Sequence, residues 1–387
     1  MTISLPSDCP QGGRLAAPVW PRIGIVGPLP PPSGGMANQC EQLARLLKAE
    51  GAQIELVRSN QPYWPPVVGK VPVFRAVWRL FHFLALLWRA LGRVDVLHIF
   101  ANSGWSWHLV ALPAMQLARW RKVAVIVNYR GGQADVFFSY GPRHVLRLLS
   151  RATLRVTPSD YLRRVFAKHG LIAQVIPNII DLSRFGPTDR RRSGIGPHLI
   201  VTRNLELIYD ISTAIRAFAL IRQRLPNALL TVAGTGPERL ALEQLVVRLG
   251  VKGAVTFSGQ IDNKNIVDLY AAADCLLNPS TVDNMPISIL EAMASGVPVI
   301  STDAGGIPDM VRHGVTALLV PVGDHEAMAN QALQLLEDHG MADRLRAAGI
   351  AEVQRYGWPN VKPMWQAAYQ CASGKGVLPT AISRHCS

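Results

Sequence analysis

Two acidic residues, Asp283 and Glu291, stand eight positions apart in the stretch STVDNMPISILEAMASGVPVIST. Asp283 falls in a predicted loop after a strand, and Glu291 interrupts the apolar run ISILEAMA of the helix that follows. A carboxylate in such an apolar helix requires hydrogen-bonding partners, because burial of an unpaired charge is costly. Carboxylates near strand ends accept hydrogen bonds from sugar or ribose hydroxyls, so a diol is one candidate partner. An internal helix cap or a salt bridge is the alternative.

A cation and two pairs of glycines accompany these carboxylates. Arg203 follows the predicted strand LIVT, where its guanidinium can bind a phosphate. Gly34 and Gly35 precede a predicted helix, whose first N–H groups favour an anion that glycine allows to approach closely. An ordinary flexible turn is the alternative there. Gly234 and Gly236 lie in VAGTGPE, which predicts a tight strand-to-helix turn. The loop GIVGPLPPPSGG departs from G-x-G-x-x-G, which counts against a nicotinamide or flavin enzyme.

Strands alternate with helices along the whole chain. Short β-rich runs such as VDVLHIF and KVAVIVNY are separated by helical segments such as CEQLARLLKAE, which is typical of a parallel sheet covered on both faces. The basic, Gly- and Pro-containing segment RFGPTDRRRSGIGPH predicts a linker, and a second alternating unit begins at LIVTRNL. Two doubly wound α/β domains in tandem place the ligand site in the cleft between them.

Composition favours a globular cytosolic protein. The 387 residues are 49% hydrophobic and 17% charged, which leaves room for two domains. The 5 cysteines are scattered, and no spacing suggests a metal site or a disulfide framework, so a reducing cytosol is expected. The first 20 residues lack the basic start and apolar core of a secretory signal.

Positive charge is concentrated in the first half of the chain. Residues 1–192 hold 25 Lys and Arg against 9 Asp and Glu, a net +16, whereas residues 193–387 hold 15 against 17, a net −2. We therefore expect the first half to face an anionic partner such as a membrane surface, a phosphorylated lipid or a nucleic acid. Simple solubility is the less favoured alternative. A nucleic acid is the least favoured partner, because the basic residues show no recognised reading motif.

The segment 73–93, VFRAVWRLFHFLALLWRALGR, is long, aromatic and basic. Four arginines interrupt it, so it is a poor membrane span. At 100° per residue the basic side chains fall on one narrow face and the aromatic ones on the rest of the helix. Two interpretations stay open, a core helix with an exposed basic stripe and a helix lying in a membrane interface. The basic residues are Arg75, Arg79, His82, Arg89 and Arg93, and the aromatic ones include Trp78, Phe81, Phe83 and Trp88.

Taken together, these motifs resemble the retaining glycosyltransferases of family 4, which have the GT-B fold of two Rossmann-like domains facing a central cleft. The resemblance runs from about Ile23 to about Tyr369. Its strongest part is the spacing from Asp283 to Glu291 followed by EAMASGVPVI. The stretches STDAGGIPDM, GTGPERLALEQL and VIPNIIDLSRF are also similar to the family, and RYGWPNVKPMWQAAYQ resembles its closing helix.

The resemblance implies a division of the chain into five segments. A flexible leader at 1–20 precedes an acceptor-side Rossmann-like domain at 21–190. A nucleotide-sugar-binding Rossmann-like domain follows at 191–355. A helix at 356–372 crosses back to the first domain, and a flexible tail occupies 373–387.

The resemblance also implies roles for individual residues. Glu291 would hold the ribose of a nucleotide sugar, and Asp283 would contact the transferred sugar. Arg203 would stabilise the negative charge that develops on the leaving diphosphate, without a metal. These three are the expected catalytic residues. The other expected donor-binding residues are Gly34, Gly35, Gly234, Gly236, Asn284, Met285 and Pro286, of which the first two would receive the diphosphate.

Two departures from the family pattern concern charge. The family has a lysine about five residues after the arginine, but RNLELIYDIS offers Ile208, Tyr209 and Asp210 there. The family also has a histidine before the glycine of a first-domain loop, where VNYRGGQAD offers Arg130 before Gly131. We expect these two residues on the acceptor side, with Arg130 either replacing the missing cation or binding an acidic acceptor.

The resemblance implies a metal-independent, retaining glycosyltransferase without a cofactor. It would move a sugar from a nucleotide sugar to a membrane-associated, lipid-linked or otherwise anionic glycan acceptor of surface or exopolysaccharide assembly. The leaving diphosphate would assist deprotonation of the acceptor, and the enzyme would lie peripherally on the cytoplasmic face of the cell membrane. Two alternatives stay open, a pseudoenzyme that binds nucleotide sugars and a sugar-nucleotide epimerase of the same fold.

Overall fold

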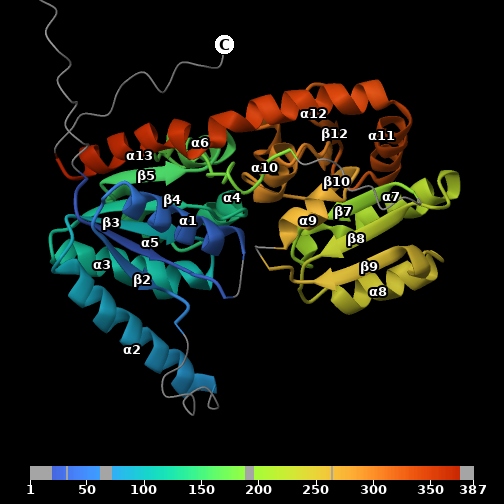
Figure 1. Cartoon of the computed structure of the whole chain (residues 1–387). Helices are drawn as coiled ribbons and strands as arrows, with labels where there is room; N and C mark the ends of the chain where they lie inside the picture. Colours follow the sequence, from blue (N-terminus) through green and yellow to red (C-terminus); the bar gives the residue numbers. More distant parts are fainter. Residues whose placement is uncertain (1–19, 32–33, 62–71, 188–195, 263–264, 375–387) are drawn as a thin grey trace, which may run out of the picture.

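Two parallel six-stranded sheets form the two halves of the molecule (Figure 1). The computed structural model describes residues 20–31, 34–61, 72–187, 196–262 and 265–374, and only the backbone of 72–77. Most of the expected leader and tail, at 1–20 and 373–387, lies outside the described residues. The prediction of two Rossmann-like α/β domains is confirmed.

The first sheet has the strand order β2-β1-β3-β4-β5-β6. Its four inner strands are largely buried on both faces, as in β1, where all five residues are buried. This explains why they read as continuous apolar runs and not as alternating ones. The strands are β1 (Ile23–Gly27), β2 (Ile54–Arg58), β3 (Val96–Ala101), β4 (Ala124–Tyr129), β5 (Leu154–Thr157) and β6 (Gln174–Val175).

Helices cover both faces of this sheet. One core contains side chains of a helical layer that includes α2 (Pro72–Leu91), α3 (Leu112–Trp120), α4 (Ala134–Tyr140), α5 (His144–Ser150) and α6 (Asp160–Lys168), with the π-helix η2 (Trp107–Ala111). The second core, on the other face, is formed by strand side chains together with those of α1 (Gly35–Ala49) and the last helix α13 (Trp358–Ala372).

The second sheet has the order β12-β11-β10-β7-β8-β9. Two helical layers again enclose it. Its strands are β7 (His198–Val201), β8 (Leu229–Ala233), β9 (Val255–Gly259), β10 (Cys275–Asn278), β11 (Val299–Thr302) and β12 (Leu318–Val320). Its helices are α7 (Ile211–Arg224), α8 (Arg239–Arg248), α9 (Ile266–Ala271), α10 (Ile287–Ala294), α11 (His325–Glu337) and α12 (His339–Val353). Short 3-10 turns are η3 (Leu207–Tyr209), η4 (Lys252–Ala254), η5 (Ile307–Asp309) and η6 (Gln354–Tyr356).

The chain crosses between the two domains twice. After β6, Ile180 and Phe185 pack into a core of the second domain. After α12, the chain returns through α13, and these two helices run along both domains in Figure 1. The Tyr369 hydroxyl of α13 lies 2.6 Å from Nδ1 of His98 in β3, inside the first domain. These two crossings bring the carboxyl ends of both sheets to a shared cleft.

Helix α2 projects from the first domain (Figure 1), and only part of its surface packs into the core. Phe83 and Leu87 are buried, whereas Trp78, Phe81 and Trp88 are 43%, 67% and 42% exposed. The three exposed aromatic side chains lie on the solvent-facing side of the helix together with His82 and Arg89, so the exposed stripe is both aromatic and basic. The side chain of Arg75 lies outside the described residues, and Arg93 follows the helix and pairs with Glu55. Among the helices that the structure describes, none is long and apolar enough to cross a bilayer.

Candidate functional site

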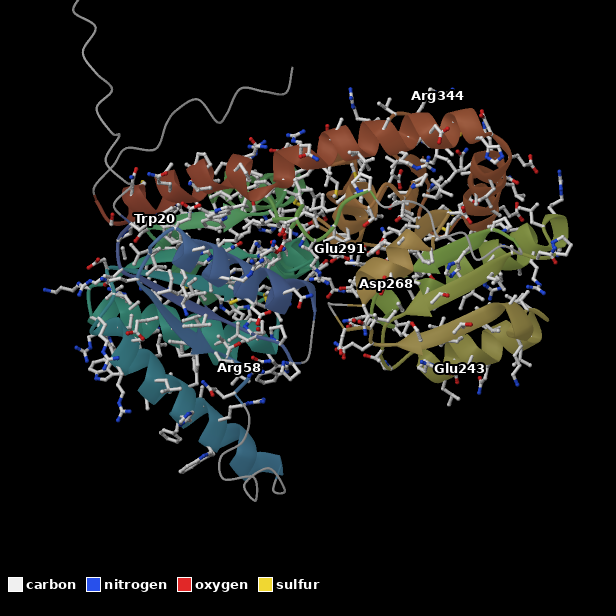
Figure 2. The ribbon with its side chains drawn as sticks, viewed as in Figure 1. Trp20, Arg58, Glu243, Asp268, Glu291 and Arg344 are labelled. Carbon is white, nitrogen blue, oxygen red and sulfur yellow. The ribbon has the colours of Figure 1, made fainter. Side chains whose placement is uncertain are left out.

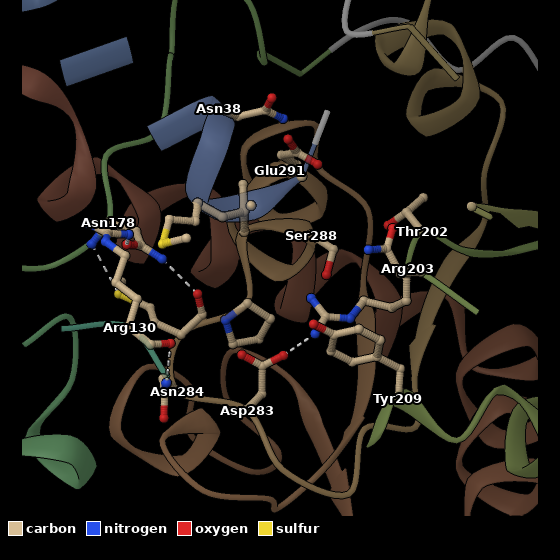
Figure 3. Close-up of a pocket in the computed structure, with 18 of the residues that line it drawn as sticks. Asn38, Arg130, Asn178, Thr202, Arg203, Tyr209, Asp283, Asn284, Ser288 and Glu291 are labelled. Atoms are coloured by element: carbon tan, nitrogen blue, oxygen red, sulfur yellow. Dashed lines mark hydrogen bonds and ion pairs between the residues drawn. The ribbon is translucent and has the colours of Figure 1, made fainter. Parts of the chain in front are cut away.

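A cavity of about 310 Å³ lies between the domains, at the carboxyl ends of both sheets (Figure 3). Both domains contribute to its walls, and Figure 2 shows Glu291 at this junction. The predicted site residues that line the cavity are Gly34, Gly35, Arg130, Arg203, Gly234, Asp283, Asn284, Met285, Pro286 and Glu291. Residues that also line the cavity but were not predicted from the sequence include Asn38, Asn102, Asn178, Thr202, Tyr209 and Ser288.

Gly131 and Gly236 are not among the residues that line this cavity. A Cβ atom on Gly131 would lie 2.4 Å from Oγ of Ser103, and one on Gly236 would lie 2.2 Å from the carbonyl oxygen of Leu205. Both distances are shorter than any normal contact. These glycines therefore allow close packing of the loops behind the cavity, and their expected role in contacting a ligand has no support in the geometry.

The loop that carries Asp283 is fixed by the glycine pair of STDAGGIPDM. The Gly306 N–H donates to the Asp283 carbonyl oxygen at 2.7 Å. A Cβ atom on Gly306 would lie 2.0 Å from the carbonyl oxygen of Asn284, and Gly305 has φ +57°. Because only glycine meets both conditions without strain, this pair explains how the loop reaches the cavity.

Arg203 and Asp283 form an ion pair in the cavity wall (Figure 3). Each side chain is 12% exposed. The Arg203 guanidinium also lies 4.0 Å from the centroid of the Tyr209 ring, which belongs to the segment that lacks the expected lysine. The sequence predicted that the arginine would meet a phosphate and the aspartate a sugar, but it did not predict that they would pair with each other.

Glu291 lies on α10 and is held by a tyrosine. The Tyr270 hydroxyl donates to Oε2 of Glu291 at 2.9 Å and lies 2.9 Å from Oγ1 of Thr202. Neither alternative left open by the sequence, a helix cap or a salt bridge, is found for this carboxylate in the described part of the chain. Burial raises the pKa of Glu291 to about 7, although the Tyr270 hydrogen bond and the charges of Arg184 and Arg203 act to lower it.

Two asparagines link the domains across the cavity. Nδ2 of Asn178 donates to the carbonyl oxygen of Met285 at 2.8 Å, and Nδ2 of Asn284 donates to the carbonyl oxygen of Arg130 at 2.9 Å. The Arg130 guanidinium in turn donates to Oδ1 of Asn178. Asn178 lies in VIPNII, so the motif was visible in the sequence, but nothing in the spacing predicted its partner 107 residues away.

The described residues contain no group of three or more His, Cys, Asp or Glu side chains placed to hold a metal ion. The polar groups of the cavity are instead cations, amides, hydroxyls and two carboxylates. Such a set can bind hydroxyl groups and an anion at opposite ends of one ligand.

Comparison with known proteins covers both domains. The profile of the family described as glycosyl transferases group 1 matches residues 190–352, and that of Glycosyltransferase Family 4 matches residues 33–184. An uncharacterised glycosyltransferase of Methanocaldococcus jannaschii is 32% identical over 376 residues, which cover 88% of this chain and 95% of that protein. The GDP-mannose-dependent α-(1-6)-phosphatidylinositol monomannoside mannosyltransferase of Mycobacterium tuberculosis is 30% identical over 266 residues, 63% of this chain and 69% of that protein.

Two further comparisons are a shorter sequence match and a solved structure. The N-acetyl-α-D-glucosaminyl L-malate synthase of Bacillus anthracis is 39% identical over 152 residues, which cover 38% of this chain and 39% of that protein's length. The crystal structure of Anabaena HepE with UDP and glucose has a TM-score of 0.72 at 18% identity, covers 90% of this chain and 99% of that one, and shows the same fold. Because family profiles match each half and one relative aligns along most of the chain, the protein belongs to glycosyltransferase family 4 and has the GT-B fold.

Proposed function

We propose that the protein is a retaining glycosyltransferase that moves a sugar from a nucleotide-sugar donor to a lipid-linked glycan acceptor. The observation that carries this proposal is the interdomain cavity, which joins a buried carboxylate, an ion pair and an uncapped helix start. The acceptor would be an intermediate of surface or exopolysaccharide assembly at the cytoplasmic face of the membrane.

The donor would lie along the cavity from Glu291 to the start of α1. Ribose hydroxyls donate to the Glu291 carboxylate, and the diphosphate lies at the first turn of α1. No side chain caps this helix, and its first turn holds no acidic residue. Apart from neighbouring residues of the same chain segment, no described atom lies within 4 Å of a Cβ built on Gly34 or Gly35, which leaves room for an anion at these N–H groups.

Retention of the anomeric configuration would follow from the residues that line the acceptor side of the cavity. The first-domain residues that line the cavity are glycine, methionine, asparagine, arginine and proline, so the described residues there include no carboxylate or histidine to act as a base. An oxygen of the leaving diphosphate would accept the acceptor proton on the same face of the sugar. The bond from C1 to the diphosphate breaks, the bond from C1 to the acceptor oxygen forms, and the configuration is kept.

A nucleotide panel tests this function. We expect one nucleoside diphosphate and its sugar to stabilise the protein, by about 2.7 kcal/mol at a hundred times the dissociation constant. Thermal shift identifies the base, and product analysis with that donor then measures transfer and anomeric configuration. Absence of stabilisation by any nucleotide would contradict the proposal. Tight binding without transfer or hydrolysis across a broad acceptor panel would support the binding-only alternative.

The lipid acceptor and the location at the membrane rest on two observations. The similar protein of Mycobacterium tuberculosis is named a phosphatidylinositol monomannoside mannosyltransferase. The exposed stripe of α2, formed by Trp78, Phe81, His82, Ala85, Trp88 and Arg89, places aromatic and basic side chains side by side in solvent. Aromatic rings insert at the lipid headgroup level while basic groups meet anionic lipid, which is the chemistry of an interfacial helix.

We expect the protein to sediment with vesicles that contain anionic lipid, and this binding to weaken as salt rises. The double variant Trp78→Ser, Phe81→Ser should bind about tenfold or more weakly, since it removes two apolar contacts with the bilayer. The matched control is Leu240→Ser, Val247→Ser, which removes exposed apolar side chains from α8 of the second domain. Trp88 is left intact because the Arg121 guanidinium packs 3.7 Å from its ring centroid. A protein that stays in the supernatant with acidic vesicles at low salt would contradict this location.

A further inference from the structure

Arg130 is a guanidinium in the cavity wall with few partners. It follows β4, and its side chain lines the cavity opposite Arg203 (Figure 3). One hydrogen bond leads to Oδ1 of Asn178, and the Phe100 ring centroid lies 5.0 Å away. Its Nε is enclosed and has no hydrogen-bond partner among the described residues. No carboxylate in the described part of the chain forms an ion pair with it.

Arg130 is half-buried, and a guanidinium that is partly withdrawn from water is ordinarily paired. Burial lowers the pKa of Arg130 to about 10. The two titratable groups that interact with it are Cys40 and His98, and both are neutral near pH 7, since burial raises the pKa of Cys40 to about 12 and lowers that of His98 to about 3. Within the described part of the chain, Arg130 is therefore charged without a counter-charge, and an anion in the cavity would supply one.

Among the described residues that line the cavity, the second domain contributes one cation, Arg203. Arg203 shares its charge with Asp283, and Ile208, Tyr209 and Asp210 occupy the segment where the family pattern has a lysine. Arg130 is also tied to the loop that carries Asp283, because Asn284 donates to its carbonyl oxygen at 2.9 Å. The described lining of the cavity thus has a paired arginine on the second domain and, on the first, an arginine without a carboxylate partner.

We propose that Arg130 binds the diphosphate of the donor from the first domain and replaces the missing second cation. This inference rests on the proposed function and deepens it. The guanidinium would hold phosphate oxygens through charge-assisted hydrogen bonds, together with the N–H groups at the start of α1. A phosphate group on the acceptor has the same chemistry, so the experiment separates the two sources.

The test compares Arg130→Met and Arg130→Lys with the native protein by calorimetry, without acceptor. The probes are the nucleoside, the nucleoside diphosphate and the nucleotide sugar of the base that the panel identifies. We expect Arg130→Met to lose about 10- to 100-fold in affinity for both diphosphate ligands and to keep its affinity for the nucleoside. Arg130→Lys should recover part of the loss, which keeps the test decisive if the methionine variant fails to fold.

Arg155→Met is the matched control. Arg155 is another first-domain arginine without a carboxylate partner in the described residues, and it donates to the carbonyl oxygens of Leu149, Ser150, Ala152 and Ile172 outside the cavity. Its loss should change stability and leave diphosphate affinity unchanged.

Two outcomes would overturn the inference while leaving the proposed function intact. One is native diphosphate affinity in folded Arg130→Met. The other is native donor affinity combined with a raised KM for a phosphate-bearing acceptor, which would assign Arg130 to the acceptor. Failure of the native protein to bind any nucleoside diphosphate would instead refute the proposed function itself.

Discussion

Arg203→Ala should lower the turnover number by about 100-fold or more, the loss observed when one preorganised donor to a developing negative charge is removed. The guanidinium lies in the cavity wall, where the proposed diphosphate departs. The substitution also leaves the Asp283 carboxylate, 12% exposed, without its ion-pair partner. An unpaired negative charge there would repel the diphosphate, so both effects act in the same direction. Initial rates at saturating donor measure the change.

Stability must be separated from catalysis in this variant. Loss of one partner from a buried ion pair costs on the order of 3–5 kcal/mol of folding free energy, so rates are measured well below the melting temperature. Arg239→Ala is the control, because Arg239 also pairs with a carboxylate, Glu243, and faces the Phe257 ring at 4.8 Å, but on α8 outside the cavity. Native rates in folded Arg203→Ala would show that another cation carries this role, and Arg130 would be the first to examine.

The sequence predicted the fold because the fold depends on local patterns. Buried strands appear as short apolar runs, and their alternation with helices specifies parallel sheets. The special position of Glu291 was also predictable, because a carboxylate inside the apolar run ISILEAMA needs a polar partner. The partner itself, Tyr270, lies 21 residues earlier on another helix, and nothing in the sequence shows that the two side chains meet.

Pairings across long separations account for most of what could not be predicted. Arg203 and Asp283 are 80 residues apart, and Asn284 reaches Arg130 over 154 residues. Taken alone, each of these residues suggested a bond to an external ligand. Nothing in their spacing shows that they form hydrogen bonds or ion pairs with one another instead. Helix α2 shows a similar limit. Its helical period was correct, but the face turned toward the core is decided by the sheet it packs against, which buries Phe83 and exposes Phe81.

Substitution of Glu291 should have the second large effect, a loss of affinity for the nucleotide sugar, and this affinity should depend on pH. Burial raises its pKa to about 7 in the free protein. Because this folded-state pKa lies above the unfolded one, the stability contributed by this group is full below the unfolded pKa and is lost as pH rises through about 7. Ribose hydroxyls that donate to the carboxylate favour its ionised form and lower the pKa in the complex. Nucleotide binding should therefore release a proton near neutral pH.

Affinity for the nucleotide sugar is accordingly expected to rise with pH, by up to about tenfold per unit below pH 7, and to level off above it. Glu291→Gln should lose about 1.5–3 kcal/mol of binding free energy at pH 8 and show a flat profile between pH 6 and 8. The nucleotide sugar is the correct probe, because its diphosphate is a diester without a group that titrates in this range. Calorimetry in two buffers with different ionisation enthalpies measures the proton release directly.

Glu243→Gln is the control for this series, since Glu243 lies on α8, away from the domain junction (Figure 2). His98 does not interfere, because burial lowers its pKa to about 3 and it stays neutral across the range. A flat native profile with no proton release would mean that Glu291 is already ionised before the donor binds, or that no hydroxyl reaches it. Native affinity in folded Glu291→Gln would select the second explanation and place the ribose elsewhere in the cavity. A pH dependence that survives the substitution would assign the titration to a different group.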